Sequence, residues 1–150
     1  MQNGFVAGER WRRIAVHAIG GLTDVGFLGD GSRLLVASHQ GRGEFDVTTC
    51  ERVARDGNED ASAWFDESGP SCLAVSRDEW VPVAGLAGGS LPTESAEWRI
   101  VITGNEASVV DGVGSTQQLS SGEEIRVAGF APNGDVLVVG CPSDLSIFRR

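Results

Sequence analysis

"DVGFLGDGSRLLVAS" runs from Asp24 to Ser38, and "VAGFAPNGDVLVVGC" runs from Val127 to Cys141. The two phrases lie 103 positions apart, and both place a Gly-Phe pair, an Asp-Gly or Asn-Gly pair and an apolar run at matching positions. Asp-Gly and Asn-Gly are strong hairpin signals because both residues of the pair tolerate positive φ. Each phrase therefore predicts a strand, a tight turn and a second strand, and the matched Phe45 and Phe148 mark a third strand.

A weaker copy lies between these two. "VAGLAGG", residues 83–89, begins like the second phrase and has Leu86, which we expect in the core, in the place of Phe27 and Phe130. After an inserted loop, three further segments are predicted strands: "WRIVIT" (98–103), "ASVVD" (107–111) and "STQQLSS" (115–121). The sequence therefore contains three related units.

The second strand of every unit is a continuous apolar run, "LLVA", "IVI" or "VLVV". A strand has this composition when both of its faces are covered, whereas a half-buried strand alternates. Small sheets that stack face to face around an axis cover their strands in this way.

Each unit also needs a fourth strand. "TTCERVARD" supplies one after the first unit, but the chain ends directly after the third strand of the last unit. The strand-like residues 11–17 have no partner within their own unit. We therefore expect this N-terminal strand to complete the last sheet and to cover an edge that would otherwise favour aggregation.

Composition limits the classes of function. The chain has 150 residues, a net charge of −9, twelve Arg and no Lys, and an acidic surface repels the phosphate backbone of nucleic acids. The absence of Lys excludes a Walker phosphate loop and Schiff-base chemistry. No apolar run approaches the roughly 18 residues of a membrane span, and the N-terminus lacks a signal-peptide pattern. We therefore predict a bacterial cytoplasmic protein that binds neither nucleic acid nor membrane.

Residues 17–53 and 122–148 resemble blades of the WD-repeat type of β-propeller. The first stretch has an apolar-Phe strand, an Asp-Gly turn, an aromatic-Asp strand end at Phe45-Asp46, and a "TTGE"-like turn with Cys50 where Gly is usual. The resemblance implies an all-β fold of three propeller-like antiparallel sheets (blades), the last closed by the N-terminal strand. A six-bladed ring of two chains and a compact three-sheet prism both remain open.

We assign residues 1–150 to one domain. Its first repeat covers about 20–55, an insert covers 56–78, the second repeat covers about 79–121, and the third covers about 122–150 together with strand 11–17. The insert places Asp56, Asn58, Asp60 and Glu67 at EF-hand calcium-loop positions, but Ala61 stands where the sharp turn needs Gly. We favour a solvated acidic loop, and we expect no metal site and no cofactor.

Catalytic patterns are weak. His17 and His39 are the only histidines, and no G-x-S-x-G elbow is present. The candidate carboxylate pairs are sequence neighbours, which point to opposite faces of a strand. We therefore predict that the chain is not an enzyme.

Two groups of residues are candidate partner-binding sites. Trp64, Phe65 and Asp66 lie in the insert, where a long loop on a rigid scaffold can carry a binding surface, whereas Trp11, Trp80 and Trp98 are expected to pack in strands. The second group forms if the termini pair, because Arg12 and Arg13 then approach Arg149 and Arg150 and make either a solvated edge or a cationic patch.

These observations favour a non-catalytic protein-interaction module with an accessory or toxin-neutralising role. Its partner would be another protein or a second copy of the chain. A carbohydrate-binding propeller is an alternative that predicts equivalent aromatic residues in all three units. A hydrolase that uses the acidic insert is a third hypothesis.

Overall fold

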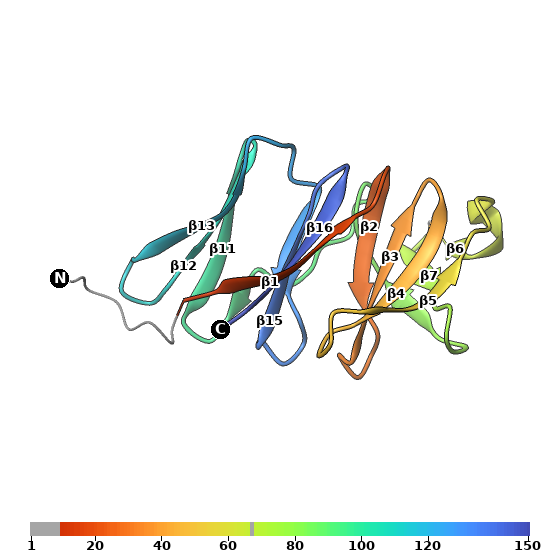
Figure 1. Ribbon diagram of the computed structural model, residues 1–150, viewed down its shortest axis with the longest axis horizontal. Coiled ribbons are helices and arrows are strands. Elements are labelled where there is room, and N and C mark those ends of the chain that lie inside the picture. Colours follow the sequence, from red (N-terminus) through yellow and green to blue (C-terminus); the bar gives the residue numbers. More distant parts are fainter. Residues whose placement is uncertain (1–9, 67) are drawn as a thin grey trace.

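The computed structural model describes residues 10–66 and 68–150. These residues form four antiparallel sheets, which we number I to IV in their order along the long axis of the molecule (Figure 1). Apart from the short 3₁₀ helix η2 (Ala61–Ala63), the regular structure of the described residues is β. No helix in the described part of the chain is long and apolar enough to cross a membrane.

Sheets I and II are four-stranded. Sheet I has the strand order β10 (Glu94–Ser95), β11 (Trp98–Thr103), β12 (Glu106–Val110), β13 (Thr116–Ser121). Sheet II has the order β1 (Arg12–Ala18), β16 (Asp144–Arg149), β15 (Val136–Gly140), β14 (Val127–Phe130).

Sheet III has five strands and sheet IV has three. The order in sheet III is β5 (Arg52–Asp56), β4 (Gly41–Asp46), β3 (Arg33–Ser38), β2 (Leu22–Phe27), β9 (Ala84–Gly85). The order in sheet IV is β6 (Phe65–Asp66), β7 (Ser71–Leu73), β8 (Trp80–Pro82).

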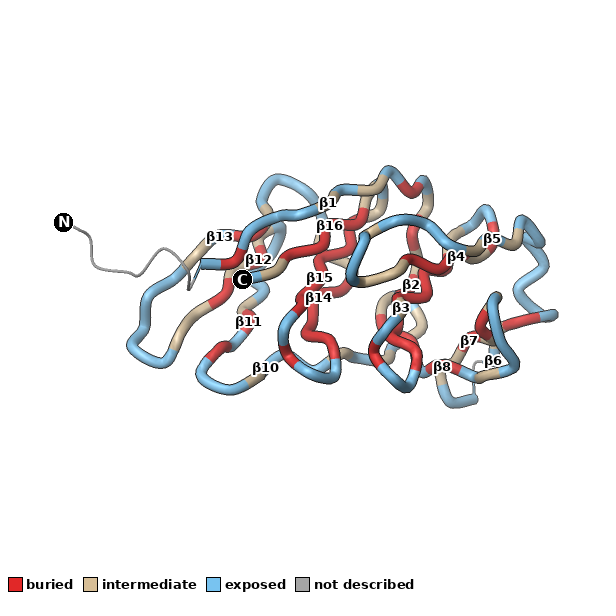
Figure 2. Tube along the Cα trace, turned by 60° about the horizontal axis from the view of Figure 1, so that its bottom comes forward, coloured by how far each residue is buried: buried red, intermediate tan, exposed pale blue. Residues whose placement is uncertain are grey.

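Three apolar cores hold the row together, one at each sheet-to-sheet contact. Figure 2 shows the buried residues along the inner strands and exposed residues in the connecting loops. The continuous apolar strands behave as expected: in β15, Val136 and Val138 face sheet III while Leu137 and Val139 face sheet I. Because side chains alternate along a strand, sheets II and III are covered on both faces.

The expected pairing of the two ends of the chain is present. β1 runs antiparallel to β16, with Arg12 opposite Arg149 and Ala18 opposite Asp144, and a register shift lies between Arg13 and Ala15. β1 forms the outer edge of sheet II, and its residues Ile14 and Val16 are exposed.

One feature of the predicted architecture is wrong. The described residues form four sheets where three were expected, and these four sheets stand in an open row (Figure 1). The extra sheet arises because the insert is not a plain loop: Phe65–Asp66 and Ser71–Leu73 pair with each other and then with Trp80–Pro82. Their Cys72 and Val81 cover a face of sheet III that would otherwise expose Leu35 and Ala37.

The middle unit is therefore divided among three sheets. Its first segment does not join the strands that follow it; Ala84–Gly85 pairs with β2 at the inner edge of sheet III. Leu86, expected in the core, is 58% exposed as a result. The strands of residues 98–121 form sheet I in the predicted order.

The hairpin turns also differ in detail from the prediction. Gly31 (φ 75°) and Gly134 (φ 79°) have positive φ, but the preceding Asp30 and Asn133 do not. Both loops contain the same backbone hydrogen bonds, from Gly31 to the Leu28 carbonyl and from Gly134 to the Ala131 carbonyl. The turns are thus longer loops that end in a left-handed glycine, a common alternative to the two-residue hairpin.

Candidate functional site

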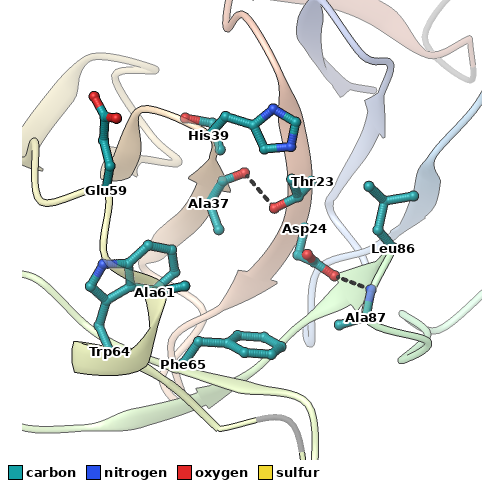
Figure 3. A pocket seen from close by; sticks show the side chains of 11 residues that line it. Thr23, Asp24, Ala37, His39, Glu59, Ala61, Trp64, Phe65, Leu86 and Ala87 are labelled. Carbon is teal, nitrogen blue, oxygen red and sulfur yellow. Dashed lines mark hydrogen bonds between the residues drawn. The ribbon is translucent and has the colours of Figure 1, made fainter.

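A pocket of about 710 Å³ opens between sheet III and the insert. Its walls come from β2, from the β3–β4 turn, from residues 59–65 of the insert and from the segment after β9 (Figure 3). The lining residues are Thr23, Asp24, Ala37, Ser38, His39, Glu59, Ala61, Trp64, Phe65, Leu86 and Ala87. The pocket volume is typical of ligand sites, which combine apolar walls with a few polar groups.

An irregularity in β2 shapes the floor of this pocket. The pairing of β2 with β3 shifts register between Leu22 and Asp24, so Thr23 is an extra residue in its strand. The Thr23 hydroxyl donates to the Ala37 carbonyl at 3.2 Å (Figure 3). A bulge of this kind re-aims the neighbouring side chains, and it lies next to Asp24.

Asp24 is a buried acid in this pocket. Its side chain is only 4% exposed, and its carboxylate accepts a hydrogen bond from the Ala87 backbone N–H at 3.0 Å (Figure 3). No ion pair joins Asp24 to a cationic side chain of the described residues. A buried carboxylate with so few partners is costly unless something else compensates its charge.

Gly85 allows the chain to wrap around this acid. Its φ is +142°, and a Cβ at this position would lie 2.1 Å from the Thr23 carbonyl oxygen. The close approach lets the Leu86 N–H donate to the same carbonyl at 3.0 Å. The following Ala87 N–H is thereby directed at Asp24, and the Leu86 side chain is left exposed at the pocket rim.

The insert supplies an aromatic wall. Trp64, predicted to contact a partner, is only 5% exposed, so most of its side chain packs in the core between sheets III and IV. Its indole N–H donates to the Asn58 carbonyl at 2.9 Å, and the Arg42 guanidinium lies over the ring at 5.3 Å from its centroid. Arg42 also donates to the Leu73 carbonyl and to the Asp56 carboxylate. Trp64 is therefore an anchor that reaches the pocket with part of its ring, and Phe65 lines the pocket beside it.

The acidic side chains of the insert make local hydrogen bonds. The carboxylates of Asp60 and Asp66 each accept bonds from the serine two residues later, and Asp56 is held by Arg42 and by the Asn58 N–H. These bonds lower the pKa of all three aspartates. Asp66 is exposed and does not line the pocket, and Glu67, the last position of the calcium-loop pattern, lies outside the described residues.

The four arginines at the paired termini lie in the other half of the molecule (Figure 1). The guanidinium of Arg13 lies over the Phe148 ring at 5.6 Å, and that of Arg150 lies over the Trp11 and Trp98 rings at 5.1 and 5.7 Å. Arg149 donates to the Val47 carbonyl, and Arg12 is exposed opposite it. The structure does not bring this group together with Trp64 and Phe65.

Other candidate groups have structural partners. The His17 ring bonds the Cys50 carbonyl at 2.8 Å and packs on Phe45, so it does not pair with a serine nucleophile. The tryptophans only partly follow expectation, because Trp11 and Trp98 are buried but Trp80 is 51% exposed on the outer face of sheet IV.

One group of described residues has metal-ligand geometry: ligand atoms of Glu123, Cys141 and Asp144 lie within 4.8 Å of one another. Burial raises the pKa of the Cys141 thiol, which disfavours the thiolate that a metal needs. This group therefore carries no proposal.

Asp24 is the site residue that sequence reasoning missed. The signal was present in the opening phrases, because Asp24 matches Val127 in the last unit and Val83 in the middle unit, and both valines are buried. Because the other two units have Val at this position, the fold does not require a charge there. The charge of Asp24 therefore indicates a role in this unit alone.

No family model matches this sequence, and no curated protein matches it. Solved structures with some likeness are WD-repeat and β-propeller domains. The Myceliophthora thermophila Cps50 (Swd1) β-propeller domain is 16% identical with a TM-score of 0.32, and the match covers 86% of this chain and 51% of that one. The Neurospora crassa Pan2 WD40 domain is 12% identical with a TM-score of 0.33, covering 93% and 55%. Kluyveromyces lactis Hsv2 is 11% identical with a TM-score of 0.29, covering 82% and 58%.

The chain thus spans about half the length of these propellers. Its sheets I and II have the four-stranded antiparallel order and the face-to-face packing of propeller blades. The functional inferences below rest on the residues of this chain alone.

Proposed function

We propose that this chain is a non-catalytic protein-interaction module that binds its partner at the pocket between sheet III and the insert. The observation that carries the proposal is the pocket itself: a concave site on strands β2 and β3, with Leu86 at its rim and a buried acid in its wall. Leu86 is 58% exposed, and an exposed large apolar side chain beside a pocket is a feature of binding surfaces.

Site geometry favours binding over hydrolysis by the insert. A carboxyl group that serves as a general acid needs a raised pKa, so that it still holds its proton near neutral pH. The pKa values of Asp56, Asp60 and Asp66 are lowered by their hydrogen bonds, which keeps these groups ionised. Their negative charge is better suited to holding the insert in place and to repelling acidic ligands.

A carbohydrate-binding role finds less support. Repeated sugar pockets require equivalent aromatic rings, but Phe27 and Phe130 are buried in cores and the third equivalent is the aliphatic Leu86. One face of Trp64 is already covered by Arg42. A glycan panel with a binding response that Leu86→Asp removes would favour this alternative.

The finer form of the proposal is an accessory or toxin-neutralising protein of the bacterial cytoplasm, and it rests on composition and size. A second copy of the chain is the other candidate partner, because Trp80 of β8 in sheet IV is exposed. Native mass measurement at micromolar concentration decides this point, since a strictly monomeric mass excludes self-association as the function.

The direct test places a photo-crosslinking amino acid at position 86 in the producing cell, and at position 113 as a matched control. Val113 is 88% exposed in the loop between β12 and β13, far from the pocket. We expect one defined adduct from position 86 only. The protein identified in the adduct is then purified by itself. It should bind the wild-type chain and the Val113→Asp variant equally, and it should bind Leu86→Asp at least about tenfold more weakly. Equal binding to all three proteins would contradict the proposal.

A further inference from the structure

We propose that the pocket selects a cationic group, namely an arginine side chain presented by a basic segment of the partner. This inference rests on the proposed function and specifies its ligand. The element that carries it is Asp24, a carboxylate 4% exposed, which lines the pocket and accepts one hydrogen bond, from the Ala87 N–H.

The repeat shows that the fold does not need this charge. Val127 occupies the matching position in sheet II and Val83 the matching position in the sequence of the middle unit, and both are buried, 6% and 3% exposed. Placing a carboxylate at such a position costs free energy because the charge loses its water. A cation that enters the pocket would recover that cost as a charge-assisted hydrogen bond.

The other walls match the same ligand. Glu59 adds a second carboxylate, and no arginine is among the described residues that line the pocket. The guanidinium that contacts the aromatic wall, that of Arg42, lies over the Trp64 ring and is paired with Asp56. Trp64 and Phe65 contribute aromatic surface, on which a planar guanidinium stacks better than an ammonium group.

Charge on the whole protein favours the same class of partner. The net charge of −9 attracts basic segments over a distance and repels acidic ones. The exposed Leu86 at the rim offers an apolar contact to residues that flank the arginine. The occupant is therefore a basic peptide segment with an arginine among apolar neighbours.

The test is a titration of the intact chain with a capped peptide that has a central arginine. Binding is measured by calorimetry and by the NMR signal of the Trp64 indole N–H. The matched control peptide has citrulline, which keeps the shape and loses the charge. We expect the arginine peptide to bind and to shift the Trp64 signal, and the citrulline peptide to bind at least about tenfold more weakly. Equal binding of the two peptides, or no binding of either, would overturn the proposal.

Two variants locate the effect. Asp24→Asn keeps an oxygen that can accept from the Ala87 N–H, and it should weaken arginine-peptide binding at least about tenfold. Asp135→Asn removes the same charge from an exposed turn in sheet II and should leave binding unchanged. If Asp24→Asn fails to fold, Glu59→Gln replaces it, with an expected loss of about twofold to fivefold because Glu59 is exposed. Unchanged binding in both Asp24→Asn and Glu59→Gln would contradict the inference.

Free arginine forms a separate arm, because a small cationic metabolite presents the same chemistry. Binding of free arginine as tight as that of the peptide would reject the peptide segment as the occupant. Failure of this inference and failure of the proposed function are distinguishable: an adduct at position 86 with no preference for arginine removes the cationic specificity and leaves the interaction role intact.

Discussion

Sheets II and III are built on nearly the same stretch of sequence, but they differ in the buried residues at two matched positions. In both, a glycine and a phenylalanine end the first strand, the loop closes on a left-handed glycine, and an apolar strand is buried on both faces. Sheet III differs in that it places acids at two buried positions where sheet II has apolar residues. Asp24 stands where sheet II has Val127, and Glu44 stands where it has Ile147.

The two acids are handled in opposite ways. Glu44 is fully buried, and its carboxylate accepts from the Val75 and Ser76 N–H groups, from the Ser76 hydroxyl and from Arg33. Asp24 accepts from Ala87 and faces the pocket. One substitution in a repeat can thus hold a neighbouring segment on the scaffold, while another can leave a charge available to a ligand.

The largest expected effect concerns Glu44, which ties the loop between β7 and β8 to sheet III. Glu44→Ala removes the acceptor that holds the Val75 and Ser76 N–H groups and leaves space at a fully buried position, so we expect the free energy of unfolding to fall by about 3 kcal/mol. Arg33→Ala removes only a half-exposed ion-pair partner at 3.4 Å and should cost about 1 kcal/mol or less. Urea unfolding measures both, and equal small losses would show that Glu44 does not hold this loop.

The same carboxylate should make stability depend on pH. Burial by itself raises the pKa of Glu44, but the hydrogen bonds from Ser76 and Val75 outweigh it, and the pKa lies below the ordinary value of 4.5. A lowered pKa in the folded state stabilises the fold above the unfolded pKa, and this stabilisation is lost as pH falls through the folded value. The stability difference between wild type and Glu44→Gln should therefore be full at pH 6 to 7 and shrink as pH falls below 4.5. A difference that stays constant down to pH 3 would contradict this assignment.

The shared glycine of the two phrases tests how closely the sheets pack. A Cβ on Gly26 would lie 2.2 Å from the Pro82 carbonyl oxygen, and one on Gly129 would lie 2.2 Å from the Leu91 Cβ. Gly26→Ala and Gly129→Ala should each lower the free energy of unfolding by about 2 to 3 kcal/mol, because the Pro82 carbonyl and the Leu91 Cβ can move only with their backbone. Gly43→Ala, whose nearest neighbour is 3.6 Å away, is the control for calorimetric melting. A loss as large at Gly43 would show that crowding is not the cause.

Replacing Asp24 by the valine that sheet II has at the matched position tests whether the acid serves the fold or the ligand. Asp24→Val removes an uncompensated charge and one hydrogen bond, so we expect the free energy of unfolding to stay constant or to rise by about 1 kcal/mol. Binding at the pocket should be lost in the same variant. Destabilisation by more than about 2 kcal/mol would instead make Asp24 a structural residue.

The smallest effect concerns Ala96 and Cys50, the two non-glycine residues with positive φ in the part of the chain that the structure describes. Ala96 (φ 54°) is exposed in the turn between β10 and β11, so Ala96→Gly should raise the free energy of unfolding by about 1 kcal/mol. Cys50 (φ 62°) packs against the core with its thiol, and Cys50→Gly should gain less. Thermal melting of Ala96→Gly and Cys50→Gly measures which variant gains more stability. Ala61→Gly is the control and should lose stability.

Local patterns in the sequence predicted much of the fold. The repeated phrases located β2, β3, β14 and β15 and the loops between them, and the unpaired segment 11–17 predicted the strand that pairs with β16. The fourth sheet was missed because its strands have only two or three residues, too few for an alternating pattern. Their pairing depends on sheet III, whose second face they cover.

The candidate site was predictable only in part. Trp64 and Phe65 were selected for their place in the insert, but Trp64 proved to be an anchor, and the acid beside them was not found. Asp24 comes near residues 59–65 and 86–87 only after folding, through a bulge in one strand and the close approach of Gly85. Nothing local in the sequence marks such contacts.

The sequence by itself determined an all-β chain of related strand–turn–strand units, because apolar runs and glycine turns act over a few residues. Tertiary structure alone decided that the insert becomes a fourth sheet, that Ala84–Gly85 joins sheet III, and that Asp24 lines a pocket. These outcomes depend on burial between segments far apart in the chain, where packing and desolvation outweigh local preference.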